Sequence, residues 1–184
     1  MKQKGIIMKL RKLCDKDAES MLEWMHDPAV NQFFRAHFAQ MTMENARSFI
    51  RGGQSAAARH YAICDDEDAY QGTISLKDID VENGTAEYAI VLRRQAQGKG
   101  YARFATREIL RIAFEKLDLC KVYLNVWKEN VHAVGFYEHM GFQREGEARE
   151  QLLQAFQKFT ANTRSPIFHT IKDCIASHAG QSAL

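Results

Sequence analysis

A glycine-rich turn is the stretch of this chain whose residue types could bind an anion. Positions 97 to 102 read Gln-Gly-Lys-Gly-Tyr-Ala, between a run with strand character, Thr85 to Leu92, and a long amphipathic segment. Two glycines let the chain curl with its backbone N–H groups pointing inward, and the first turn of a following helix adds the positive end of its dipole. We therefore expect a phosphate-type anion at this junction.

The spacing within this turn excludes two familiar phosphate-binding motifs. A dinucleotide fingerprint needs Gly or Ala three residues after Gly100, where Arg103 stands. A P-loop needs Ser or Thr directly after Gly-Lys, where Gly100 itself stands. Taken alone, the stretch is also compatible with an ordinary strand-to-helix turn that binds nothing.

A second stretch, Asn130 to Phe142, combines a helix start, a tyrosine and a helix stop. Asn130 can cap a helix, Tyr137 follows about two turns later, and Gly141 suits the left-handed position after the last turn. Gly135 inside this helix is a poor helix former, at a cost of about 1 kcal/mol relative to alanine. By itself, Tyr137 is as readily explained as a packed core residue.

The two stretches together resemble the cofactor-binding motifs of the GNAT superfamily of acyl-CoA-dependent N-acyltransferases. The resemblance covers roughly residues 5 to 150. Trp24 to Val30 looks like the first-helix ending of the branch that holds ribosomal-protein N-terminal, spermidine and nucleotide-amino-sugar acetyltransferases. It departs from that branch at Gln154 to Ile171, which lacks the usual short Gly turn. The resemblance implies direct acetyl transfer from acetyl-CoA to a primary amine, with no metal.

The resemblance also implies roles for individual residues. Tyr137 would protonate the departing thiolate, and Glu87 would be the general base or would only orient the acceptor, with Glu82 and His132 as weaker alternatives. Close packing against the cofactor would explain Gly135. Cofactor contacts are expected from Ile90, Val91 and Leu92 along the pantetheine arm, from Gln97, Gly98, Lys99, Gly100, Tyr101 and Ala102 at the pyrophosphate with help from Arg93, Arg94 or Arg103, and from Asn130.

The acceptor is less well defined by the sequence. Eight acidic side chains and one basic one, Lys77, lie between Asp65 and Glu87, which leans toward a cationic acceptor. We favour a small amine, an amino sugar or a polyamine, over a protein N-terminus; a non-catalytic acetyl-CoA-binding regulatory module is the alternative from another class. Candidate walls of the acceptor site, most of them expected to be structural, are Trp24, His26, Phe33, Phe34, Arg35 and His37.

The elements that must position these residues can be predicted from periodicity and capping signals. Strands are expected at 5–13, 60–64, 70–79, 85–92 and 121–127, with a tight turn at Asn83-Gly84 joining the third and fourth. Helices are expected after Asp15 or Asp17, from Thr42 to about Arg51, after Gly100, and from Asn130 to about Met140. The fold class is α/β: a GNAT-like mixed central sheet with antiparallel N-terminal strands and a βαβ cofactor unit whose two strands run parallel, flanked by about four helices.

Composition narrows the remaining possibilities. The 184 residues suit a single domain, 1–184, with a core at about 5–150 and a C-terminal tail, about 175–184, that can be disordered. A net charge of +2 argues against nucleic acid as partner. Four cysteines without a Cys-x-x-Cys pair indicate neither zinc nor a redox pair. The lack of a long apolar run argues against membrane insertion, so we expect a cytoplasmic enzyme; a homodimer stays open.

Overall fold

The computed structural model describes residues 7–34, 38–147 and 181–183. These residues fall into two compact units that divide between Val122 and Tyr123, and each is described by itself. The single domain over 1–184 stays a prediction. The stretch Gln154 to Ile171, where the sequence lacks the usual Gly turn, lies outside the described residues. So does the first part of the expected tail, 175–180.

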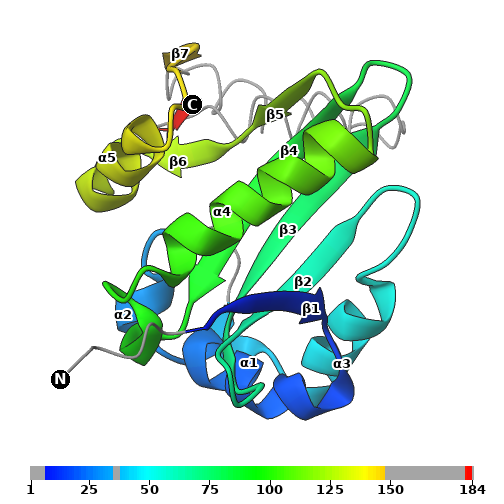
Figure 1. Ribbon diagram of the computed structural model, residues 1–184. Helices are drawn as coiled ribbons and strands as arrows, with labels where there is room; N and C mark the ends of the chain where they lie inside the picture. The colour runs from blue at the N-terminus through cyan, green and yellow to red at the C-terminus, as the bar shows by residue number, and fades with distance from the viewer. Residues whose placement is uncertain (1–6, 35–37, 148–180, 184) are drawn as a thin grey trace, which may run out of the picture. The chain divides into compact units, whose positions relative to one another are not determined.

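The first unit is built on a sheet whose strands lie in the order β1-β2-β3-β4-β5 (Figure 1). Each pair of neighbouring strands from β1 to β4 is antiparallel, as predicted. The parallel pairing of β5 with β4 stays a prediction. The strands are β1 (Lys9–Lys12), β2 (Arg59–Cys64), β3 (Tyr70–Asp80), β4 (Thr85–Leu92) and β5 (Lys121–Tyr123).

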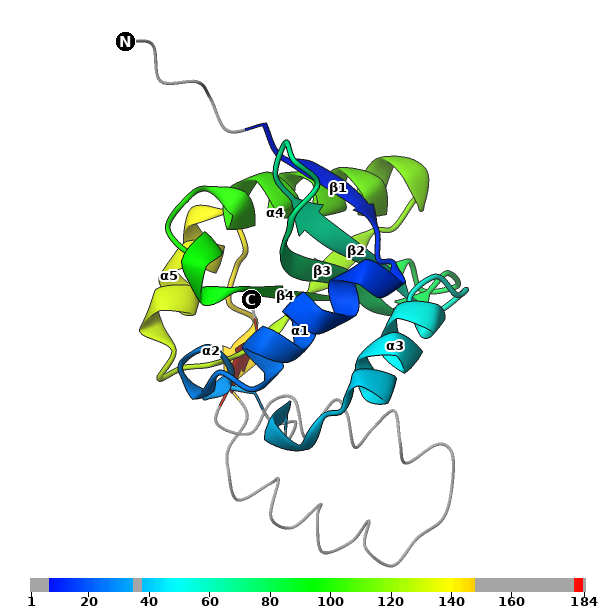
Figure 2. The ribbon, with the colours of Figure 1, turned by 90° about the horizontal axis from the view of Figure 1, so that it is seen from below.

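Helices cover both faces of this sheet. Figures 1 and 2 show α4 across one face and α1 and α3 across the other. On the α4 face, the buried hydroxyls of Tyr88 and Thr106 are 2.8 Å apart and join β4 to α4. On the other face, Met21 and Ile50 belong to an apolar cluster against which Val91 of β4 packs. The helices are α1 (Ala18–Met25), α2 (Pro28–Asn31), α3 (Met43–Gly52) and α4 (Tyr101–Arg111), the last continued by a π turn at Ile112–Lys116.

Helix boundaries follow the predicted capping residues. The Thr42 hydroxyl accepts from the Asn45 N–H at 3.3 Å, and the Asn45 side chain accepts from the Thr42 N–H at 2.8 Å, so a capping box starts α3. Helix α1 ends before Asp27-Pro28, because the residue before proline is pushed out of helical geometry. The Asp27 carboxylate then caps α2 by accepting from the Ala29 N–H at 2.9 Å.

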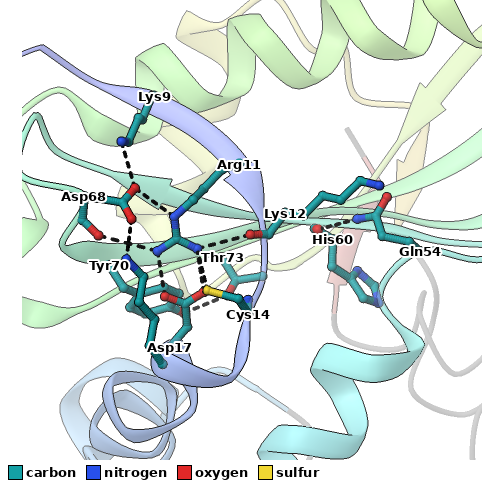
Figure 3. A network of polar contacts seen from close by, with 11 residues as sticks. Lys9, Arg11, Lys12, Cys14, Asp17, Gln54, His60, Asp68, Tyr70 and Thr73 are labelled. Carbon is teal, nitrogen blue, oxygen red and sulfur yellow. Dashed lines mark hydrogen bonds and ion pairs between the residues drawn. The ribbon is translucent and has the colours of Figure 1, made fainter.

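The predicted cap of the first helix has a different role. The buried Asp17 carboxylate accepts hydrogen bonds from the Arg11 guanidinium at 2.7 and 2.8 Å and from the Cys14 N–H at 2.9 Å, and it does not cap α1 (Figure 3). Arg11 also donates to Asp68 at 2.9 Å, in the loop after β2. Burial opposes ionisation of Asp17, but the bonds from Arg11 and Cys14 lower its pKa on balance. This network ties β1, the start of α1 and the β2–β3 loop together.

The turn between β3 and β4 differs from the predicted tight Asn-Gly turn. It spans four residues, 81–84, and only Gly84 of the dipeptide has a positive φ, 65°. Asp80 explains the longer form, because its carboxylate accepts from the Asn83 N–H at 2.9 Å and from the Asn83 side-chain amide at 2.7 Å. Such local bonds stabilise a wider turn than a two-residue hairpin loop.

The second unit corrects one further prediction. The expected single strand at 121–127 is broken at Leu124, and its second part, β6 (Asn125–Trp127), belongs to a separate sheet of order β6-β8-β7. That sheet is completed by β7 (Gly146–Glu147) and β8 (Gln181–Ala183). That the rest of the tail, about 175–184, can be disordered stays a prediction. Both β6 and β7 pair antiparallel with β8. Helix α5 (Val131–His139) packs against β6.

Candidate functional site

The glycine turn presents backbone N–H groups to solvent at the start of α4. Gly98 and Gly100 have φ values of 73° and 89°, which side-chain-bearing residues rarely adopt. Gly100 is the N-cap residue and α4 has no side-chain cap. The first hydrogen bond into the helix runs from the Phe104 N–H to the Gly100 carbonyl at 3.1 Å, so the N–H groups before Phe104 point out of the helix end. This is the geometry of an anion site.

Side chains around the turn divide into exposed cations and structural anchors. Lys99, Arg94 and Arg103 are exposed, and within the described part of the chain none of them has an ion-pair partner. Tyr101 is buried, so its side chain anchors the helix and only its backbone is left for a ligand. The turn therefore combines outward-pointing backbone N–H groups with positive side chains that no described carboxylate neutralises.

Arg93 is engaged elsewhere, unlike its exposed neighbours. Its guanidinium donates to the Tyr70 carbonyl at 3.1 Å and forms an ion pair with Glu23 of α1. It fixes the residue after β4 to the α1 side of the sheet. We therefore no longer count Arg93 among the candidates for phosphate binding.

The last residues of β4 keep one edge free of β5. Cys120 and Lys121 both donate to the Gly84 carbonyl, at 2.7 and 3.0 Å, so β5 begins beside the start of β4. With three residues, β5 spans only about 10 Å, whereas Ile90 lies about 16 Å along β4 from Thr85. Strand β6 belongs to the other sheet. Among the described strands, Ile90, Val91 and Leu92 thus pair with β3 only.

Glu87 lies on the face of β4 that is turned away from α4. Side chains alternate along a strand, so Glu87 shares a face with Val91, on the side of α1 and α3. Its direct cross-strand partner is Lys77, whose Nζ is 3.2 Å from the Glu87 carboxylate. The Glu87 side chain is 21% exposed, so water and small cations can reach it. Any cationic acceptor that binds Glu87 must share it with Lys77.

The acidic run between Asp65 and Glu87 does not form one surface. Asp65 to Asp68 lie before β3, and Asp80 and Glu82 lie at its opposite end. Asp68 is occupied by Lys9, Arg11 and Lys16, whose hydrogen bonds lower its pKa, and Asp80 by Asn83. The structure therefore does not support the use of this acidic run as an argument for a cationic acceptor.

Two of the six candidate walls, Trp24 and His26, are engaged in contacts within the protein. Trp24 is buried and donates to the Tyr70 hydroxyl at 3.0 Å, and it packs edge-on against Phe38 with ring centroids 5.1 Å apart. A ring nitrogen of His26 is 2.8 Å from the Met41 carbonyl. Phe33 and Phe34 are more than a third exposed and are left as wall candidates. The proposed walls Arg35 and His37 lie outside the described residues.

The second unit contains the other two predicted site residues. Asn130 caps the start of α5, where its side-chain Oδ1 accepts from the Ala133 N–H at 3.3 Å, and Gly141 follows the helix with a φ of 94°. Tyr137 is buried and lies in T-shaped contact with Phe136 and Phe142. Burial raises the pKa of the phenol well above its ordinary value, so the phenol is protonated at neutral pH and is a weaker acid than an exposed tyrosine.

Asn125 is a residue that the sequence analysis did not single out. Both polar atoms of its side chain are buried and have no hydrogen-bond partner within the described part of the chain. Its only signal in the sequence is a polar residue between two apolar strand positions, Leu124 and Val126, which does not distinguish it from a solvent-facing residue. That these atoms have no partner among the described residues can be seen only in the structure.

Metal and redox chemistry were not expected from the sequence. Within the described ranges, no group of three or more His, Cys, Asp or Glu side chains is arranged to hold a metal ion. Cys14, Cys64 and Cys120 are free thiols. No helix among the described residues is long and apolar enough to cross a membrane.

Comparison with known proteins relates this geometry to one family. Residues 8–143 match the family model described as an acetyltransferase (GNAT) domain. The chain is 36% identical over 95 residues to a spermidine N(1)-acetyltransferase of Vibrio cholerae, a match that spans 52% of this chain and only 55% of that relative. It is 29% identical over 141 residues to the spermidine N(1)-acetyltransferase of Escherichia coli K12, covering 76% of this chain and 75% of the relative.

A solved structure extends the similarity to the fold. The crystal structure of spermidine N-acetyltransferase from Vibrio cholerae in complex with CoA and spermine superimposes with a TM-score of 0.71 at 27% sequence identity. The match covers 78% of this chain and 85% of that one. The family model spans well over half of the sequence and includes both motif stretches. The chain therefore belongs to the GNAT family of acetyltransferases.

Proposed function

We propose that the protein transfers the acetyl group of acetyl-CoA directly to a primary amine of a small molecule, with a polyamine as the preferred acceptor. The observation that carries the donor half is the exposed, uncapped turn at Gln97 to Ala102 ahead of α4. The acceptor half is supported by similarity to spermidine acetyltransferases over three quarters of the chain. An amino sugar and a protein N-terminus are the competing acceptors.

In this proposal the donor is held mainly by backbone groups. The N–H groups between Gln97 and Ala102 bind the pyrophosphate, and the exposed cations Lys99, Arg94 and Arg103 add charge. The edge of β4 at Ile90 to Leu92, with which no other described strand pairs, binds the pantetheine amides as an added strand would. A backbone N–H in this region also polarises the thioester carbonyl and stabilises the oxyanion formed on attack. Asn130 contacts the cofactor arm from the start of α5.

Deprotonation of the acceptor falls to Glu87 in this proposal. An aliphatic ammonium with a pKa near 10 must lose a proton before attack, which costs roughly 4 kcal/mol at pH 7. The Glu87 carboxylate, partly exposed on the α1 and α3 face, can accept that proton directly or through water, or it can only orient the ammonium. In both cases Lys77 must yield part of its ion pair to the incoming cation.

Tyr137 completes the transfer as the proton donor. The amine nitrogen attacks the thioester carbon, the C–S bond breaks, and the departing thiolate takes a proton from the phenol. The phenol is protonated at neutral pH and so has a proton to give. Burial also raises its pKa further above that of a thiol, about 8.5, so the transfer is uphill unless the bound donor lowers the phenol pKa. No covalent enzyme intermediate is needed, since the acceptor amine is itself the nucleophile.

A direct assay tests the proposed activity. Purified protein is mixed with acetyl-CoA and spermidine, thiol release is followed with a thiol reagent, and the product is identified by its mass. We expect thiol release that depends on spermidine and a product that carries one added acetyl group. Turnover with N-terminal peptides but with no small amine would replace the acceptor half of the proposal.

Assembly and location are separate proposals. A solved structure describes the Vibrio cholerae spermidine N-acetyltransferase as dodecameric. We propose that this chain also forms an oligomer, and light scattering on the purified protein distinguishes that from a monomer or the homodimer that the sequence left open. The cytoplasmic location stays a prediction.

A further inference from the structure

Among the residues that the structure describes, the side-chain amide of Asn125 has none of the partners that a buried amide needs. Asn125 is the first residue of β6, and both its Nδ2 and its Oδ1 are buried without a hydrogen bond to any described residue. Buried polar atoms in folded proteins nearly always have a partner, and one that lacks it in the free protein is a position where a ligand or water can supply it. The orphaned groups here are one donor group and one acceptor on the same carboxamide.

Asn125 lies in the same unit as two residues proposed to contact the donor. Strand β6 packs against α5, the helix that starts after Asn130 and carries Tyr137. All three residues belong to the unit that begins at Tyr123. The orphaned amide is therefore on a strand directly next to the helix that supplies the proposed proton donor.

The chemistry of the missing partner can be narrowed by what a carboxamide requires. An alkylammonium only donates, so it would satisfy Oδ1 and leave Nδ2 without an acceptor. A phosphate only accepts at neutral pH, so it would leave Oδ1 without a donor. A secondary amide offers one N–H and one C=O and satisfies both. In the proposed reaction the pantetheine arm of acetyl-CoA is the part that contains secondary amides.

We propose that Asn125 binds an amide of the pantetheine arm of acetyl-CoA. This inference rests on the proposed function, because it takes acetyl-CoA to be the donor. It makes Asn125 a residue whose polarity destabilises the free protein and stabilises the complex. Free stability and donor affinity should thus change in opposite directions when the amide is removed.

Asn125→Leu tests this directly, since leucine has nearly the shape of asparagine and no polar atoms. In the free protein the variant should melt about 3 °C higher, because an unsatisfied buried amide is gone. Calorimetric titration with CoA should show a dissociation constant about tenfold higher, from the loss of two hydrogen bonds. Titration with 3′-phospho-ADP, the part of CoA without pantetheine, should be unchanged.

Asn83→Leu is the matched control, because the Asn83 amide is exposed and already bonded to Asp80. It should leave both titrations unchanged and should not raise the melting temperature. Asn125→Ala serves the same test if the leucine variant does not fold. Unchanged CoA affinity in a stabilised Asn125→Leu variant would overturn the inference and assign the amide to water. A raised KM for the acceptor with unchanged CoA affinity would instead mean that the Asn125 amide binds the acceptor. Failure of the wild type to bind CoA would refute the proposed donor.

Discussion

Gly72 lies in β3 directly opposite Leu92, at the end of the strand proposed to bind the pantetheine arm. A Cβ added at this position would lie 2.3 Å from the Val91 carbonyl oxygen, 2.7 Å from the Leu92 Cδ2 and 3.0 Å from the Leu92 Cα. Two of these three atoms are backbone, so a side-chain rotation cannot relieve the contact. Gly72→Ala must therefore displace β4 at Val91 and Leu92.

The size of the effect follows from that geometry. Overpacking a well-packed site costs about 1–3 kcal/mol, and each kcal/mol lowers the melting temperature of a protein of this size by about 2–4 °C. We expect Gly72→Ala to melt about 6 °C lower than the wild type. Because the displaced backbone is the proposed pantetheine edge, the KM for acetyl-CoA should also rise, by about tenfold.

Gly52→Ala is the matched control for this substitution. Gly52 is the last residue of α3, it has no positive φ, and a Cβ there would meet nothing within 4 Å. The control should melt at the wild-type temperature or slightly above it, with unchanged kinetics. The two variants are compared by thermal melting and by steady-state kinetics below the melting range. A Gly72→Ala variant with wild-type melting temperature and KM would refute the account of this strand.

Four further outcomes can be checked with the same assays. Tyr137→Phe should lower kcat about 100-fold with little change in acetyl-CoA affinity, and unchanged turnover would remove its role as acid. Gly135→Ala should stabilise the free protein by about 1 kcal/mol, since a Cβ there meets nothing within 4 Å, and should weaken CoA binding if this face of α5 packs on the cofactor. Glu87→Gln should lower kcat and flatten its pH profile if Glu87 is the base, but should raise only the KM for the acceptor if Glu87 orients the amine. Lys77→Met should lower the KM for the acceptor in both cases. Asp17→Asn should lower the melting temperature at neutral pH, and its difference from the wild type should shrink as the pH falls below about 4. The pKa of Asp17 is lowered in the folded protein, so its stabilisation is complete above the unfolded pKa, about 4, and is lost as the pH falls through the folded pKa.

Local signals predicted much of the fold correctly, because the residues that decide a helix end lie next to it in sequence. Thr42 with Asn45, Asp27 with Pro28, and Asn130 all act within three residues of themselves. The glycines at 98, 100 and 141 have the positive φ values that their positions suggested. The antiparallel hairpin from 70 to 92 was likewise predictable from alternation and its turn residues, although the turn type was not.

Long-range pairing decided the features that the sequence did not reveal. Arg93 was grouped with its exposed basic neighbours, but its partner Glu23 is 70 positions away in sequence. The acidic run was read as one region, yet the length of β3 separates its two ends. The break at Leu124 was hidden because Leu124 and Val126 are both buried, so the alternation continues across it. The Asn125 amide, which has no partner among the described residues, has no signature in the sequence.

The most direct test of the central claim is a single measurement: the rate of free-thiol release from acetyl-CoA with spermidine, compared with the same reaction without an amine. Acetyl transfer to a small amine predicts saturable, spermidine-dependent release with one acetylated product formed for each thiol. The contradicting result would be CoA binding, detected by calorimetry or by thermal stabilisation, with no thiol release for spermidine, amino sugars or N-terminal peptides. The protein would then be a binding module that recognises acetyl-CoA without turning it over.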